Sequence, residues 1–516
     1  MTKIVFLPLD ERPCSLLFPM HLAACTDLQM VAPHHLLGMK KQPAPVAQLA
    51  QWVEREVIGA DYLLVSIDML VHGGIVPSRL HHVTVEECMD RLALLEKVRK
   101  NHPHLNIYAF SLIMRTPQYC SAEEEPDYYA DYGHLISRYS WLRNKEERNE
   151  LSQVEQDEFV QVRSSIPSAV LDDFIGRRTI NHAINRQAIE YVNDGVIDTL
   201  LIPLDDNAQF GFSVSEQRQL RLLAEQYNLM DKVFIHSGAD EAGCTLFARA
   251  FCDAKQFAPE VFIRYSSTLG PLTVPDLEER SLHEAVKSHL SAAGGYTLDN
   301  SQEADAVLAV HTAVHSVMTS DSIHDLQDRH ASYFTEINMN EFASAIDGYI
   351  RRGKVVGLAD AAIINGADHY LLQLLSKRGM LKDVSAYAGW NTIGNTLGTV
   401  IAHMIIEAYY KGQPHNEFDR LHRSREFYAL RLLEDWGYQA VIRKKLCKEH
   451  PVGFDGKKYV DLSTMKEQVD SFVNKEIQQF VESWLTDAVE GKIEVQNVYF
   501  PWNRVFEIGL DLQIVR

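Results

Sequence analysis

Residues 199–211 have the sequence TLLIPLDDNAQFG, in which an apolar run typical of a buried strand leads directly into two adjacent carboxylates. Ser213 to Glu216 then show the spacing of a helix capping box, followed by apolar residues at helical spacing. Asp205 and Asp206 are therefore predicted to lie in a loop between a strand and a helix, at the carboxyl end of the strand. Active sites of parallel α/β proteins, whether barrels or doubly wound sheets, lie at this position.

Other predicted strands also end in acidic residues. The acids are Asp10 and Glu11 after residues 3–9, Asp68 after residues 62–67, Asp240 and Glu241 after residues 233–236, and Asp360 after residues 355–359. Because the carboxyl ends of parallel strands meet at one edge of a sheet or one mouth of a barrel, this recurrence predicts a shared polar site. A simpler interpretation of each acid on its own is that it caps the next helix, because carboxylates stabilise helix N-termini.

The chain alternates between apolar, strand-like runs and amphipathic helices, which is the pattern of a mostly parallel sheet covered by helices. Strands are predicted near residues 3–8, 62–68, 106–113, 198–204, 232–237, 306–311, 354–359 and 384–388. This count of about eight favours a (β/α)8-barrel-like core, with insertions in residues 114–197 and 259–300. The alternative is a pair of doubly wound α/β domains that divide near residue 257, with Val261 to Tyr265 as the first strand of the second domain.

The α/β core is expected to span residues 1–412, either undivided or divided near residue 257. Residues 413–516 are predicted to form a C-terminal region that is mostly helical, rich in charge, and ends in strands near residues 492–495 and 505–510. A chain of 516 residues, of which 46% are hydrophobic, is long enough to bury a large core.

Composition argues against several classes of partner. The net charge of −20 and the lack of a basic, aromatic stripe argue against nucleic acid, because phosphate binding requires clustered lysine and arginine. No run of about 20 apolar residues predicts a membrane span, and charge interrupts the N-terminal apolar run too soon for a signal peptide. The seven cysteines are scattered without Cys-x-x-Cys spacing. We therefore expect a reduced, cytoplasmic protein without a thiolate metal site.

Asp205 and Asp206 are the strongest candidates for catalytic residues. Successive residues of a strand point to opposite faces, so both carboxylates can enter one pocket only where the chain has left the strand. Asn207 and Gly211 favour such a turn. Two carboxylates in one pocket repel each other, which raises one pKa and leaves a protonated acid beside an ionised base near neutral pH. Glycoside hydrolysis uses this combination.

Aromatic and amide side chains follow the last predicted strand of the core. Trp390 and Asn391 lie there, and a second such cluster, YFPWNR, occupies residues 499–504. An indole can stack on a sugar ring while an amide hydrogen-bonds its hydroxyls. Ordinary packing is an equally good interpretation of each tryptophan.

Four motifs carry a resemblance to a known family. They are LDERP at residues 9–13, DMLVHGGIVPSR at residues 68–79, PLDDNAQFG at residues 203–211 and GWNT at residues 389–392. Through them the chain resembles, over nearly its whole length, a bacterial family catalogued as a domain of unknown function. That resemblance implies a family identity and no activity.

A second similarity concerns the site alone. An Asp-Asp pair at the end of the fourth barrel strand, with tryptophan and asparagine near the last strand, is similar to the retaining β-N-acetylhexosaminidases of the O-GlcNAcase and bacterial hyaluronidase type. This resemblance implies that Asp205 holds the acetamide of the substrate, which itself attacks the anomeric carbon. Asp206 would then be the general acid and afterwards the general base.

We therefore expect a carbohydrate-active hydrolase, a retaining glycosidase of N-acetylhexosaminides, with Asp205 and Asp206 as the catalytic pair. Residues expected to bind the substrate are Asp10, Glu11, Arg12, Asp68, Arg79, Asn207, Asp240, Glu241, Asp360, Trp390 and Asn391. Arg12, Arg79 and Arg115 follow strand ends and could bind an anionic group, although a structural salt bridge is the simpler role. The expected substrate is a small molecule or an oligosaccharide. No cofactor is expected, because neither a Walker motif nor a dinucleotide fingerprint follows a predicted strand.

Two alternatives remain open. A metal-dependent hydrolase could assemble its ligands from the strand-end acids and from His72, His236 or His311. His311 and His315 have the spacing of two ligands on one helix, but the glutamate of a zinc protease does not follow the first histidine. In the other alternative, the same acids and aromatic residues bind a sugar without turning it over.

Overall fold

The computed structural model describes residues 2–314, 318–319, 326–411, 413, 418–455 and 458–515. Each of the eight segments predicted as strands forms a strand of a parallel sheet. They are β1 (Lys3–Leu7), β3 (Tyr62–Ser66), β4 (Asn106–Phe110), β5 (Thr199–Leu204), β6 (Val233–Ser237), β9 (Ala306–Thr312), β11 (Val355–Ala361) and β13 (Ala386–Ala388). Most of their residues are buried, because both faces of a parallel sheet are covered by helices.

These strands belong to two separate sheets. The first has the order β2-β1-β3-β4-β5-β6, with β2 at Gln29–Val31. The second has the order β13-β11-β9-β7-β8, with β7 at Glu260–Tyr265 and β8 at Tyr296–Thr297. A short parallel pair joins β10 (Met318–Thr319) to β12 (Ile363–Ile364).

The α/β class is thus confirmed, but within the described ranges the strands do not close into the single barrel that we expected. β6 and β7 follow each other in the chain without pairing, because α11 (Ala242–Lys255) separates them and β7 pairs with β8 and β9 instead. The alternative interpretation placed the first strand of a second sheet at Val261 to Tyr265, and this segment lies in β7.

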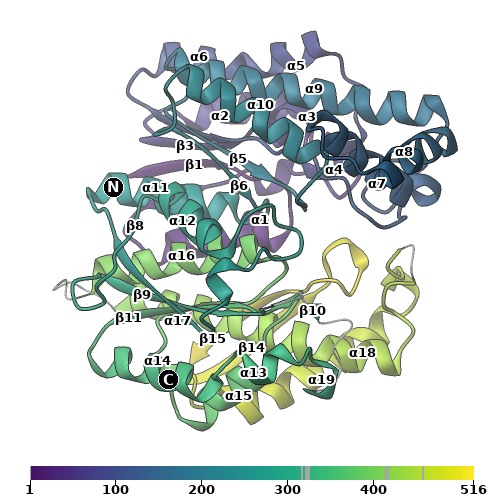
Figure 1. Ribbon diagram of the computed structural model, residues 1–516. Coiled ribbons are helices and arrows are strands. Elements are labelled where there is room, and N and C mark those ends of the chain that lie inside the picture. The colour runs from purple at the N-terminus through teal and green to yellow at the C-terminus, as the bar shows by residue number, and fades with distance from the viewer. Residues whose placement is uncertain are drawn as a thin grey trace.

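We call the part of the chain that forms the first sheet and the part that forms the second sheet its two halves. Helices from both halves fill the space between the two sheets (Figure 1). α1 (Pro13–Ala24) and α11 lie against the first sheet, α16 (Ile393–Tyr410) lies against the second, and α11 packs on α16. α12 (Leu282–Ala292) packs on β6, β8 and α16. Residues 393–406 of α16 are all buried, as expected of a helix that is apolar on most sides. One hydrophobic cluster therefore includes residues of both sheets.

Glycine makes a close contact between α16 and the turn after β6. A Cβ atom on Gly394, in the first turn of α16, would lie 3.0 Å from the Cα atom of Gly238 and 3.0 Å from the carbonyl oxygen of Ser237. Only a residue without a side chain allows the backbone of α16 to approach the turn after β6 so closely.

Other helices of the core lie on the outer sides of the two sheets (Figure 1). On the first sheet they are α2 (Val46–Glu56), α3 (Ile67–His72), α5 (Val85–Leu92), α6 (Leu94–Asn101), α9 (Ser168–Asn193) and α10 (Phe212–Gln226), and on the second they are α13 (Ser332–Thr335), α14 (Met339–Arg351) and α15 (His369–Lys377).

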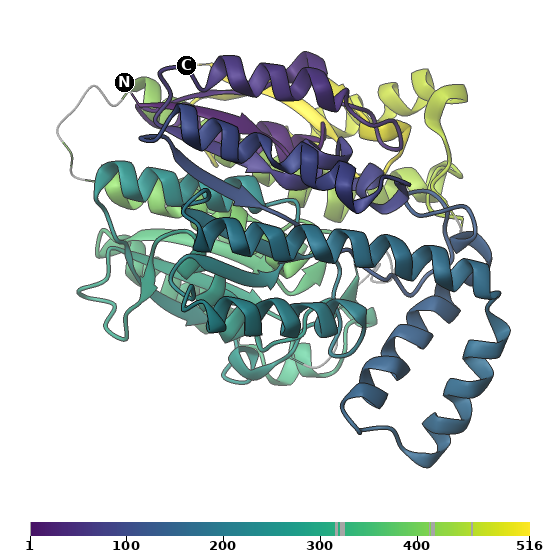
Figure 2. The same cartoon turned by 90° about the horizontal axis from the view of Figure 1, so that it is seen from above.

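Residues 114–197, which were predicted to hold an insertion, contain a helical hairpin. α7 (Tyr129–Glu147) and α8 (Gln153–Ser165) project from the body of the molecule (Figure 2), and α9 returns the chain to the first sheet. Ser152 and Glu155 form a capping box at the start of α8, which fixes where this helix begins. A hydrophobic cluster of its own holds the hairpin together.

The C-terminal region is mostly helical and ends in an antiparallel pair of strands. Its elements are α17 (Phe418–Arg431), a π-helical segment (Leu432–Ile442), α18 (Arg443–Glu449), α19 (Lys466–Phe480), β14 (Lys492–Tyr499) and β15 (Gly509–Val515). α17 packs on α1, so this region joins the core. Among all the helices that the described ranges contain, none is both long and apolar enough to cross a membrane.

Candidate functional site

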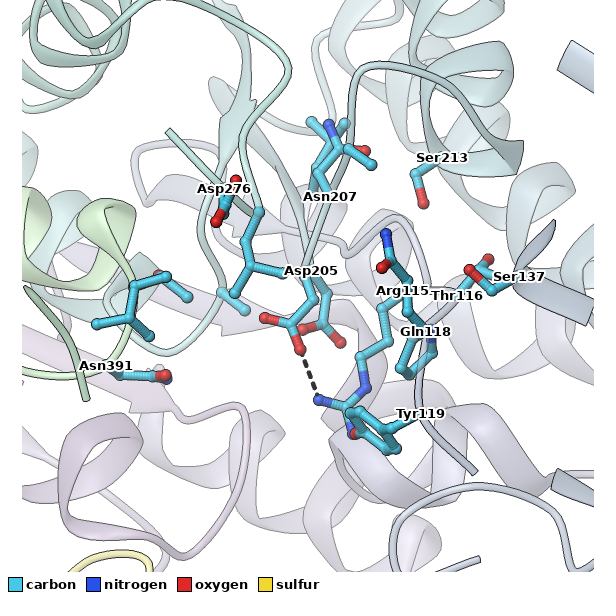
Figure 3. Close-up of a pocket in the computed structure, with 18 of the residues that line it drawn as sticks. Arg115, Thr116, Gln118, Tyr119, Ser137, Asp205, Asn207, Ser213, Asp276 and Asn391 are labelled. Atoms are coloured by element: carbon cyan, nitrogen blue, oxygen red, sulfur yellow. Dashed lines mark hydrogen bonds and ion pairs between the residues drawn. The ribbon is translucent and has the colours of Figure 1, made fainter. Parts of the chain in front are cut away.

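A cavity of about 850 Å³ lies where strands of both sheets reach their carboxyl ends. The loops after β5 and β6 line it from the first sheet, the residues after β13 line it from the second, and Ile364 and Asn365 line it at the end of β12. Trp141 of the helical hairpin and Arg504 of the C-terminal region complete its wall. Figure 3 shows Asp205 and Asn391 on different sides of this cavity, with Arg115 beside the carboxylates.

The turn after β5 brings both adjacent aspartates into the cavity, as the sequence predicted. β5 ends at Leu204, and Asp206 has a φ angle of 30°, which is not that of a strand. Because the chain has left the strand at this point, the two neighbouring carboxylates can both lie in the cavity. The predicted capping box at Ser213 is wrong. α10 begins at Phe212, the Ser213 hydroxyl donates to the carbonyl oxygen of Met114 at 3.2 Å, and Glu216 pairs with Arg178.

The two carboxylates have different arginine partners. Arg79, on the helix α4 (Ile75–Leu80), lies 2.5 Å from Asp205, whose side chain is 8% exposed. Arg115 lies 2.8 Å from Asp206, whose side chain is 25% exposed. Burial raises the pKa of Asp206 to about 6; the charge of Arg115 opposes this rise and the charge of Asp205 adds to it. Asp206 can therefore hold or release a proton close to neutral pH.

The acidic run of residues 123–125 fixes these arginines in place. Glu124 lies 3.0 Å from both Arg79 and Arg115, and it also pairs with Arg504 of the C-terminal region. Glu125 lies 2.8 Å from Arg115. Because each guanidinium contacts more than one carboxylate, positive and negative groups alternate along this wall of the cavity, and charge-assisted hydrogen bonds hold it. The salt-bridge role expected of Arg79 and Arg115 is therefore present.

Another part of the cavity wall carries an arginine between two acids and an asparagine beside them. Arg12 lies 2.6 Å from Asp10 and 2.6 Å from Asp240. Asn391 has a φ angle of 59° and donates from its side-chain amide to Asp240 at 3.4 Å. Trp390, the residue before it, is buried outside the cavity lining and packs near Phe506.

Seven of the residues expected at the site line the cavity. They are Arg12, Arg79, Asp205, Asp206, Asn207, Asp240 and Asn391. Six others do not line it, namely Asp10, Glu11, Asp68, Glu241, Asp360 and Trp390. The structure thus places these six away from the lining of this cavity, and the expectation that they bind a substrate stays a prediction.

The contacts of those residues explain their positions. Glu11 accepts from the indole N–H of Trp502 at 2.6 Å. Asp68 accepts from the backbone N–H of Leu112 at 2.9 Å, and burial raises its pKa to about 7. Asp360 accepts from the backbone N–H of Asp368 at 2.8 Å, deep in the second sheet, and burial raises its pKa to about 7 as well.

The histidines named for a metal site do not meet at the cavity. His72 stacks on His81, and His311 pairs with Asp368 in the second sheet at 2.9 Å. His315 lies outside the described residues. His236 and Glu241 do come together, with His289 as a third member, and within the described ranges these three form the one group with the spacing of metal ligands.

Several cavity residues had no signal in the sequence. Aromatic side chains from distant segments line the cavity, namely Tyr119, Trp141, Phe210 and Tyr459. Glu278 also lines it, from a loop after β7, and burial together with the charge of Glu279 raises the pKa of Glu278 to about 8. None of these residues was named as a site residue from the sequence, because the signal used there was a polar residue at the end of a predicted strand.

Comparison with known proteins assigns a family and no activity. No curated protein matches the sequence of this chain. The family described as "Protein of unknown function (DUF4127)" matches residues 4–511. As the four motifs of the sequence predicted, the chain therefore belongs to this family.

Proposed function

We propose that the protein is a retaining glycoside hydrolase that cleaves N-acetylhexosaminides with the help of the substrate's own acetamide. One observation carries this proposal: two adjacent carboxylates enter a single cavity in different electrostatic environments. Asp205 is the more buried and is paired with Arg79, whereas Asp206 is more exposed and has a pKa of about 6. An ionised carboxylate beside one that can be protonated is the combination that this reaction needs.

Each carboxylate takes one role in the proposed reaction. Asp205 accepts a hydrogen bond from the acetamide N–H, which orients the acetamide oxygen toward the anomeric carbon. As that oxygen forms its bond to the anomeric carbon, the glycosidic bond breaks and Asp206 gives its proton to the leaving oxygen. Water then attacks the anomeric carbon from the vacated side and loses a proton to Asp206, which restores the acetamide and retains the configuration.

The remainder of the cavity suits a sugar. Its volume of about 850 Å³ lies within the range of pockets that enclose small ligands. Asn207 and Asn391 offer amide groups to sugar hydroxyls, and Trp141 and Phe210 offer aromatic faces. We propose a small-molecule or oligosaccharide substrate and action in the cytoplasm, and the net charge of −20 argues against a nucleic-acid substrate.

The experiment is release of nitrophenol from a panel of nitrophenyl glycosides that includes both anomers of N-acetylhexosaminides. We expect release from N-acetylhexosaminides alone, undiminished when a chelator is added during the assay. Asp206→Asn should abolish turnover of substrates with poor leaving groups and spare activated ones in part. Asp276→Asn, which neutralises an exposed acid of the same cavity, is the matched control and should leave turnover unchanged.

Other results would replace the proposal. Turnover that stops at once with chelator and returns with zinc would favour a metal-dependent hydrolase. If no glycoside of the panel released nitrophenol and the Asp206→Asn variant still bound sugar, the protein would be a sugar-binding protein without catalysis. Undiminished turnover of poor leaving groups by Asp206→Asn would remove Asp206 from the general-acid role.

A further inference from the structure

A second polar cluster lies behind the cavity wall, apart from the residues of the proposed reaction. His236 near the end of β6, Glu241 immediately before α11 and His289 on α12 are all buried. One nitrogen or oxygen atom from each of the three lies within 4.8 Å of the other two. The two halves of the chain both contribute, because β6 belongs to the first sheet and α12 follows the first long strand of the second.

Backbone hydrogen bonds decide which ring nitrogens carry hydrogen. Nδ1 of His236 lies 2.9 Å from the carbonyl oxygen of Ser237, and Nδ1 of His289 lies 2.9 Å from the carbonyl oxygen of Ala285. A carbonyl oxygen can only accept, so Nδ1 must be the donor in both rings. In the neutral form of each ring, Nε2 therefore has a free lone pair.

One of these lone pairs lies close to a carboxylate oxygen. Nε2 of His289 lies 3.3 Å from Oε1 of Glu241. Nε2 of His236 is buried and has no hydrogen-bond partner in the part of the chain that the structure describes. One ring nitrogen of each histidine and one oxygen of Glu241 lie within 4.8 Å of one another, and buried acceptors grouped in this way destabilise a protein unless a cation or a proton satisfies them.

The carboxylate is held in this orientation by its surroundings. The backbone N–H of Ala239 donates to Oε2 of Glu241 at 2.9 Å, which leaves Oε1 directed toward His289. Two glycines make room: a Cβ atom on Gly238 would lie 1.8 Å from Oε1, and one on Gly398 would lie 2.1 Å from Cγ of Glu241. Protein metal ligands are commonly oriented by hydrogen bonds of this kind, as are the two Nδ1 atoms here.

We propose that Nε2 of His236, Nε2 of His289 and Oε1 of Glu241 bind one divalent transition-metal ion, with zinc as the ion to test first. Two imidazoles and one carboxylate are a ligand set used for zinc and for non-haem iron(II), whereas magnesium and calcium prefer oxygen ligands alone. The ion joins the turn after β6 to α12. Since Asp240 in that turn lines the cavity, the metal site holds one cavity wall in place.

The test is direct measurement of metal binding by the full chain, which does not depend on any glycosidase activity. Protein stripped with chelator and then dialysed is titrated with Zn²⁺ and, in parallel, with Co²⁺, whose visible absorption reports low-coordinate nitrogen ligands. We expect stoichiometric binding of either ion, one per chain. The thermal midpoint Tm should rise with Zn²⁺ and stay unchanged with Mg²⁺, because an ion that binds only the folded state stabilises it.

Variants that preserve side-chain size locate the ion. Glu241→Gln and His289→Gln should each weaken Zn²⁺ affinity ten-fold or more. His72→Gln is the matched control, because the ring centroids of His72 and His81 lie 4.1 Å apart, close to the 4.0 Å between those of His236 and His289. The control should bind Zn²⁺ like the wild-type protein.

Two results would overturn the proposal. Wild-type protein that is folded by circular dichroism but binds neither Zn²⁺ nor Co²⁺ stoichiometrically would show that the three residues are a hydrogen-bonded cluster and not a metal site. Undiminished binding by a folded Glu241→Gln variant would assign the ion to other histidines. Where neither variant folds, the stoichiometry and the Co²⁺ spectrum of the wild-type protein decide the question alone.

Discussion

Trp502 donates its indole N–H to the carboxylate of Glu11 at 2.6 Å, although 491 positions in the chain separate the two residues. The guanidinium of Arg12 lies 4.8 Å from the centroid of the same indole ring. The turn after β1 and the segment between β14 and β15 therefore close on each other. Arg504, two residues after Trp502, lines the cavity, so the C-terminal region is part of the cavity wall.

We predict that Trp502→Phe destabilises the protein by about 1 to 2 kcal/mol, because the Glu11 carboxylate loses a donor while the aromatic packing is mostly retained. The free energy of unfolding in urea measures this. Trp141→Phe, in the helical hairpin, is the control and should change stability less. Equal losses in the two variants would mean that indole packing, and not the bond to Glu11, matters.

We predict that Arg79→Ala destabilises the protein by about 3 to 5 kcal/mol, because it leaves buried carboxylates without their counter-charge. Arg138→Ala is the control: its ion pair with Glu158 joins side chains that are 37% and 36% exposed, and such pairs contribute about 0 to 1 kcal/mol. Urea denaturation compares the two. A loss at Arg79 no larger than that at Arg138 would contradict the view that the arginine network holds the cavity together.

We predict that Glu278→Gln is more stable than wild type at pH 8 and equal to it at about pH 4. The pKa of Glu278 is raised from 4.5 to about 8, so the unfolded chain loses its proton first. Stability consequently falls as pH rises between these values, by up to about 1.4 kcal/mol per pH unit. The glutamine variant lacks this loss. Urea midpoints recorded across this range, with chelator present, measure the difference.

The adjacent Glu279 should show the opposite behaviour. Burial favours protonation of Glu279, but Arg280 and hydrogen bonds from Ser237 and Gln217 outweigh it and hold the pKa at about 2. This carboxylate therefore stabilises the fold above its unfolded pKa of 4.5, and the stabilisation disappears as pH falls toward 2. Glu279→Gln should be less stable than wild type at neutral pH. If Glu278→Gln and Glu279→Gln were both more stable, or both less stable, than wild type at pH 8, the opposite pKa shifts assigned to the two carboxylates would be wrong.

The proposed acid role of Asp206 predicts the pH dependence of turnover. Because Asp206 must be protonated to act as the acid and its pKa is about 6, kcat should fall as pH rises above this value. Arg115 lowers that pKa, so Arg115→Gln should move the decline to higher pH. Arg143→Gln, which changes a more exposed arginine of the hairpin, is the control. If kcat declined at the same pH in the wild type, Arg115→Gln and Arg143→Gln, the decline would be due to a group other than Asp206.

The strands and the turn at Asp205 could be predicted because the forces that determine them are local. Thr199 to Leu204 are all buried, and this appears in the sequence as an uninterrupted apolar run. The pairing of strands could not be predicted in the same way. β7 pairs with β9 and not with β6 because helices of both halves pack between the sheets, and that packing joins residues far apart in the chain.

The cavity could be predicted only where strand ends form it. Arg79, Asp205 and Asp240 follow strands and line the cavity, whereas Trp141 and Arg504 come from an insertion and from the C-terminal region. The positions of these last two depend on tertiary packing alone. The direction of a side chain could not be predicted either. The sequence placed Trp390 after β13, but its side chain lies toward Phe506, a neighbour that a strand pattern does not reveal.

The close approach of Gly394 to Gly238 also bears on how a ligand enters. Many proteins built of two α/β halves open and close around their ligands by rotating one half about a hinge. Here the helices between the sheets share one apolar core, and Gly394 packs closely against Gly238, so a rotation of one half would break contacts of this core. Loop and side-chain motions keep these contacts and are faster and smaller than the motions of whole domains, so we expect ligand exchange to use them.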